Sequence, residues 1–94
     1  MIEELDNIKM VMFVLLAGKS EGEKLANYLA FLADKCGLAE KNDFILPSEY
    51  SATGMFINKS MDLLEEDRYD DWIEYFKNEL LKEQSYELIN ELHL

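Results

Sequence analysis

The fold is decided by residues 61–83, which read MDLLEEDRYDDWIEYFKNELLKE. Acidic and aromatic side chains alternate here at the spacing of an α-helix. One continuous helix would place four carboxylates on one face, at positions i, i+3, i+4 and i+7: Asp67, Asp70, Asp71 and Glu74. The same period places five apolar side chains on another face: Tyr69, Trp72, Ile73, Phe76 and Leu80. The pattern predicts an amphipathic helix with Trp72 and Phe76 buried and the acids exposed.

Two further helices are predicted upstream. The first runs from about Ile2 to Ala17, although the apolar run Met10–Ala17 is also compatible with a buried strand. Gly18 is suited to end it. The second runs from about Glu21 to Cys36, with Ser20 and Glu23 as a capping box at its start and Gly37 at its end.

Residues 38–60 are compatible with two predicted structures. Phe44–Leu46 and Met55–Ile57 could pair as a short hairpin, or Ser48 could cap a third helix. The last ten residues either extend the acidic helix or form a separate short one. We therefore expect a mainly α fold, a compact bundle of about four helices, with a short β-hairpin between residues 44 and 57 as the alternative to a further helix.

Composition predicts one domain that spans residues 1–94. The chain has 94 residues, of which 49% are hydrophobic, and this content with periodic spacing favours a folded core over disorder. The single cysteine, Cys36, excludes an internal disulfide and fits a reducing compartment. The N-terminus is acidic where a secretory signal would be basic, and Met10–Ala17 is too short to cross a bilayer. These features predict a cytoplasmic protein.

The net charge of −11 restricts the class of partner. A surface this negative repels nucleic acids and anionic membranes and attracts basic proteins. The excess is uneven, because residues 1–47 hold eight acidic and five basic residues whereas residues 48–94 hold twelve and four. The C-terminal half therefore carries most of the charge.

Catalytic and cofactor motifs are not found in the sequence. Gly18-Lys19-Ser20 matches the end of a phosphate-binding loop, but the glycine that this motif requires at position 13 is Phe13. The Asp67–Asp71 cluster lacks the glycine and the terminal glutamate of a calcium loop. His93 is the only histidine and lies beside the C-terminus, so Cys36 has no obvious base to activate it. We expect no enzymatic activity, no cofactor and no metal.

The acidic side chains of residues 62–83 are the candidate partner-binding site. Carboxylates on successive helical turns recur about every 5 to 6 Å, a spacing of the same order as that of phosphates along a DNA strand. A helix with such a row could compete with DNA for the lysine and arginine side chains of a DNA-binding protein. The predicted partner-binding residues are Asp62, Glu65, Glu66, Asp67, Asp70, Asp71, Glu74, Glu79 and Glu83.

The acidic run Leu64–Trp72 and the helical stretch Gly18–Gly37, in so short and acidic a chain, resemble the DNA-mimic anti-restriction proteins of bacteriophages, most closely the Arn type of T-even phages. The resemblance covers size and charge pattern. It implies an inhibitor in the cytoplasm of a host bacterium that binds a restriction enzyme or a histone-like nucleoid protein, often as a homodimer.

Two other protein classes fit the sequence. A small phage or bacterial regulator, such as an anti-sigma-like protein, would bind its partner through exposed apolar residues, for which Met10, Met12, Phe13 and Met55 are the candidates. An immunity protein or antitoxin would instead cover a basic nuclease. Salt separates the first class from a DNA mimic, because charge-driven binding weakens steeply with ionic strength.

Overall fold

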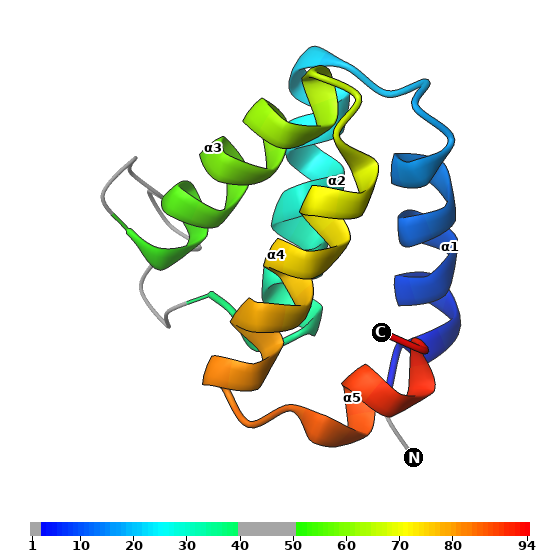
Figure 1. The fold of residues 1–94 in the computed structure, drawn as a ribbon, viewed down its shortest axis with the longest axis vertical. Helices are drawn as coiled ribbons and strands as arrows, with labels where there is room; N and C mark the ends of the chain where they lie inside the picture. Colours follow the sequence, from blue (N-terminus) through cyan, green and yellow to red (C-terminus); the bar gives the residue numbers. More distant parts are fainter. Residues whose placement is uncertain (1–2, 40–50) are drawn as a thin grey trace.

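The computed structural model describes residues 3–39 and 51–94, in which every regular element is a helix (Figure 1). Five helices follow in chain order: α1 (Leu5–Leu16), α2 (Gly22–Lys35), α3 (Ala52–Glu65), α4 (Tyr69–Lys82) and α5 (Tyr86–Glu91). The described ranges contain no strand. Helix α2 crosses behind α4, and α5 lies at the same end of the molecule as the beginning of α1 (Figure 1).

Helices α1 and α2 confirm the two helices predicted upstream, and the strand alternative for Met10–Ala17 is wrong. Gly18 and Gly37 follow these helices with φ of +72° and +74°, the left-handed conformation that glycine adopts at little cost. The predicted capping box is wrong. The N-cap of α2 is Glu21, without a side-chain capping hydrogen bond, because the helix begins one residue later than the box requires.

The stretch 61–83 is two helices and not one. Helix α3 ends at Glu65, and Asp67 then adopts a φ of +59°. The amide of Arg68 donates to the carbonyl oxygen of Leu63 over 2.9 Å, and the amide of Asp67 donates to that of Leu64 over 3.1 Å. This pair of bonds is a Schellman motif, which ends a helix. The prediction that Asp67 lies on one helical face with Asp70, Asp71 and Glu74 is therefore wrong.

The hairpin between residues 44 and 57 is also wrong in its second half, because Met55–Ile57 lie within α3. The side-chain oxygen of Ser51 accepts a hydrogen bond from the amide of Gly54 over 3.0 Å and caps this helix. The other half of the hairpin, Phe44–Leu46, and the alternative cap Ser48 lie outside the described residues. The C-terminal residues form the separate short helix α5, with Leu88 buried.

An aromatic pair on α4 lies at the centre of the core. Trp72 and Phe76 are both 0% exposed, which confirms their predicted burial, and their rings stack with centroids 5.2 Å apart. Phe56 of α3 packs against Phe76 with centroids 6.0 Å apart. Six leucines from α2, α3 and α4 are buried in the same core: Leu25, Leu29, Leu32, Leu63, Leu64 and Leu80. Helix α1 adds Ile8, Met12 and Leu15.

Candidate protein-binding surface

The nine predicted partner-binding acids are divided between α3, the turn after it, and α4. Asp62 and Glu65 belong to the end of α3, Glu66 and Asp67 to the turn, Asp70, Asp71, Glu74 and Glu79 to α4, and Glu83 to its C-cap. Eight of them are exposed, and Glu79 is half-buried. The exposure of the acids on α4 follows from the orientation of this helix, which turns Trp72, Phe76 and Leu80 inward.

The row of acids on α4 is short. Asp70 and Glu74 lie one turn apart on the exposed side of the helix, a rise of about 5.4 Å. The next outward positions are Asn78 and Leu81. The acids thus gather around the α3–α4 turn, and Glu83 lies at the far end of a helix about 21 Å long.

Arg68 neutralises two of the acids. Its Nε lies 2.9 Å from a carboxylate oxygen of Asp71, and its Nη1 lies 3.6 Å from one of Glu66. The hydrogen bond and charge of Asp71, followed by those of Glu66, raise the pKa of the Arg68 guanidinium above its ordinary value. Asp71 and Glu66 are therefore less available to an outside cation than their exposure suggests.

Glu79 is engaged within its own helix. Its carboxylate lies 3.6 Å from Nζ of Lys82 and interacts with the hydroxyl of Tyr75. Burial, with a smaller contribution from Glu79, raises the pKa of Tyr75 to about 12. Five acids around the turn remain exposed and form no ion pair within residues 3–39 and 51–94, and we call them the acidic surface: Asp62, Glu65, Asp67, Asp70 and Glu74.

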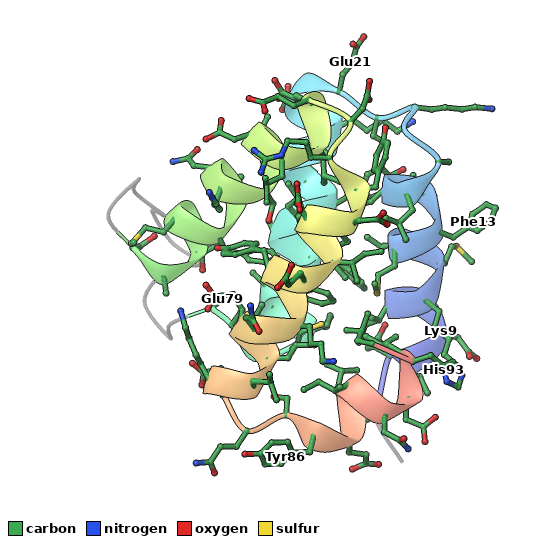
Figure 2. The ribbon with its side chains drawn as sticks, viewed as in Figure 1. Lys9, Phe13, Glu21, Glu79, Tyr86 and His93 are labelled. Atoms are coloured by element: carbon green, nitrogen blue, oxygen red, sulfur yellow. The ribbon has the colours of Figure 1, made fainter. Side chains whose placement is uncertain are left out.

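The α3–α4 turn packs against the connection between α1 and α2. The hydroxyl of Tyr69 donates to a carboxylate oxygen of Asp67 over 3.0 Å and lies so close to Gly18 that a Cβ there would be 2.3 Å away. The hydrogen bond to Asp67 is the main cause of a raised pKa of Tyr69. Glu21 lines one shallow recess together with Glu65 and Asp67, and Figure 2 places Glu21 at the same end of the molecule as the turn. The fold thus adds Glu21 to the acidic surface.

A second group of acids, absent from the predicted site, lies at the opposite end. The beginning of α1 and the helix α5 line a recess that contains five carboxylates and no lysine or arginine: Glu3, Glu4, Asp6, Glu87 and Glu91. We call it the acidic recess. The two acidic segments could be read from the sequence, but only the fold brings the two ends of the chain together.

Other candidate chemistry is limited in the described part of the chain. No group of three or more His, Cys, Asp or Glu residues there is arranged to hold a metal ion. Cys36 is 3% exposed, and burial raises the pKa of its thiol to about 12. The same residues contain no helix long and apolar enough to cross a membrane.

The predicted apolar anchors divide into two groups. Met10, Phe13 and Met55 are 63%, 76% and 59% exposed. Met12 is only 7% exposed, so its prediction as a surface anchor is wrong. Met12 shares the inward face of α1 with Ile8 and Leu15, where the helical period places it.

The whole sequence was compared with models of protein families, and none matches. No curated protein matches it either. No solved structure matches this chain.

Proposed function

We propose that this protein is an inhibitor that presents the acidic surface to the DNA-binding site of a basic protein and so acts as a DNA mimic. The supporting observation is that Asp62, Glu65, Asp67, Asp70 and Glu74 are exposed, without ion pairs among the described residues, and held around one turn. The partner class in this proposal is a bacterial restriction enzyme or histone-like nucleoid protein.

The packing beneath the acidic surface makes the acids a fixed target for a partner. Leu63 and Leu64 hold the end of α3, and Trp72 holds the beginning of α4, all at 6% exposure or less. The backbone that carries these carboxylates is fixed before binding. A partner's lysines and arginines can therefore bind them with little further loss of conformational entropy.

A pair of isosteric substitutions tests the proposal. Asp70→Asn with Glu74→Gln removes two charges from the acidic surface, and Glu23→Gln with Asp34→Asn removes two exposed charges from α2. We expect a partner captured from bacterial lysate to be displaced by added duplex DNA and by moderate salt. The first variant should capture markedly less of it, and the second should capture as much as the wild type. Equal loss in both variants would reject the acidic surface as the binding site and would indicate attraction to the overall negative charge. Capture that neither salt nor DNA reduces would reject a DNA mimic and favour an apolar mode of binding.

A further inference from the structure

Helix α1 has an apolar outer face that nothing in the described structure covers. Its residues from Met10 to Leu16 contain no charge, so the second half of the helix is apolar on every side. The bundle covers only the inner side, with Ile8 and Leu15 buried, while Met10 and Phe13 are 63% and 76% exposed. A helix that is apolar all round is ordinarily buried, which indicates that the outer side of α1 has a partner.

A groove runs beside this outer face. Met12, Phe13 and Leu16 form its wall on α1, and Leu92 forms its wall after α5. Lys9 and His93 flank the groove, and Lys9 is the only lysine or arginine that lines it. Figure 2 shows Phe13 projecting from α1 away from the bundle, with Lys9 and His93 on the same side of the molecule.

The groove continues into the acidic recess. Glu91 lines both of them, so the apolar groove and five carboxylates form one surface. This surface has no lining residue in common with the recess that Glu21, Glu65 and Asp67 form at the α3–α4 turn. The two surfaces are therefore separate, and a substitution in one removes no lining residue of the other.

We propose that this surface binds a basic amphipathic helix of another protein. The apolar side chains of that helix lie against Phe13 and Leu92, and its lysines or arginines enter the acidic recess, as in other complexes in which a helix fills a groove. A second copy of this chain fits poorly, because it brings its own acidic recess and a net charge of −11 to the contact.

Two synthetic peptides test the proposal. One is a helical peptide with leucine on one face and lysine on the other, and the second replaces every leucine with serine and keeps the charge. Affinities are measured by fluorescence anisotropy for the wild type, Phe13→Ser and the matched control Leu81→Ser, an exposed apolar residue on α4. Amide chemical shifts identify the residues that the peptide contacts and show that each variant is folded.

We expect Phe13→Ser to raise the Kd of the leucine–lysine peptide about tenfold, as loss of a central aromatic anchor does. Leu81→Ser should have no effect, and the serine–lysine peptide should not distinguish the three proteins. Shift changes should concentrate in residues 6–17 and 87–94. Equal affinities of the wild type and Phe13→Ser, or shift changes confined to α3 and α4, would overturn the proposal. So would a wild-type dimer in sedimentation that Phe13→Ser dissociates, because a second copy would then cover the face.

Discussion

The backbone amide of Arg68 donates its hydrogen bond to the carbonyl oxygen of Leu63, five residues earlier, and this bond closes the turn between α3 and α4. The same motif ends α4, where the amide of Ser85 donates to the carbonyl oxygen of Leu80 over 2.9 Å. In both turns a residue other than glycine adopts positive φ, Asp67 at +59° and Gln84 at +57°. These turns determine where the acids lie and how the core closes.

We expect Gln84→Gly to raise the free energy of unfolding by about 0.5–1 kcal/mol. Glycine removes the steric cost of positive φ at this position, which exceeds the entropy that it adds to the unfolded chain. Lys77→Gly, inside the helix, should instead lower stability by about 1 kcal/mol. Urea denaturation measures both, and a loss of stability in Gln84→Gly would contradict the backbone geometry of this turn.

Truncation of either ring of the aromatic pair should lower the stability of the protein severely. We expect Trp72→Ala and Phe76→Ala each to cost about 3–5 kcal/mol, because both rings are 0% exposed and stacked on one another. Tyr86→Ala, at 61% exposure, should change stability by no more than about 0.5 kcal/mol. Urea denaturation compares the three variants. The fluorescence of Trp72 gives a second check, since an emission maximum like that of free indole in water would place this ring at the surface.

Alkaline pH should destabilise the fold through Tyr75. Its pKa rises from 10 in the unfolded chain to about 12 in the folded protein, so the folded state retains the proton longer. The contribution of Tyr75 is therefore complete below about pH 10 and is lost as the pH rises toward 12. Urea midpoints of the wild type should fall over this range more steeply than those of Tyr75→Phe. Parallel pH profiles would show that the environment of Tyr75 does not favour its neutral form.

Cys36 should be chemically inert while the protein is folded. The thiol is buried and its pKa is raised to about 12, so almost no thiolate exists at neutral pH. We expect Ellman's reagent to react with it only at the rate at which the protein unfolds, and immediately in urea. Rapid reaction in buffer would place Cys36 in contact with solvent.

Salt should stabilise the protein. With a net charge of −11 and five exposed acids around the α3–α4 turn without ion pairs in the described structure, repulsion opposes folding, and ions screen it. We expect Tm to rise with sodium chloride concentration, and to rise less in the variant that carries both Asp70→Asn and Glu74→Gln. A Tm that falls with added salt would mean that attractive ion pairs, such as that of Arg68 with Asp71, outweigh the repulsion.

The ends of the two helices that are followed by glycine could be predicted from the sequence, and the ends of the others could not. Gly18 and Gly37 mark the ends of α1 and α2, but the ends of α3, α4 and α5 rely on Asp67, Gln84 and His93, all at positive φ. The residue types at these three positions do not predict the end of a helix. The acids continue at helical spacing through Asp67. The charge pattern therefore predicts one continuous helix where the structure has a break between α3 and α4.

The candidate site was predictable where it depends on one helix and unpredictable where it depends on the fold. The helical period alone places Asp70 and Glu74 opposite Trp72 and Phe76, and it also places Met12 inside. Glu21 reaches the acidic surface only because the α1–α2 connection packs on the α3–α4 turn. The acidic recess likewise requires α1 and α5 to meet.

The closest helix packing in the described structure joins neighbours along the chain: α1 with α2, α2 with α3, α3 with α4 and α4 with α5. Contacts between segments close in sequence form with little loss of chain entropy, so such a topology has a low contact order. Helical proteins of this kind fold on a scale of roughly microseconds to milliseconds. Synthesis, and not the search for the native state, would then limit how soon active protein appears in a cell.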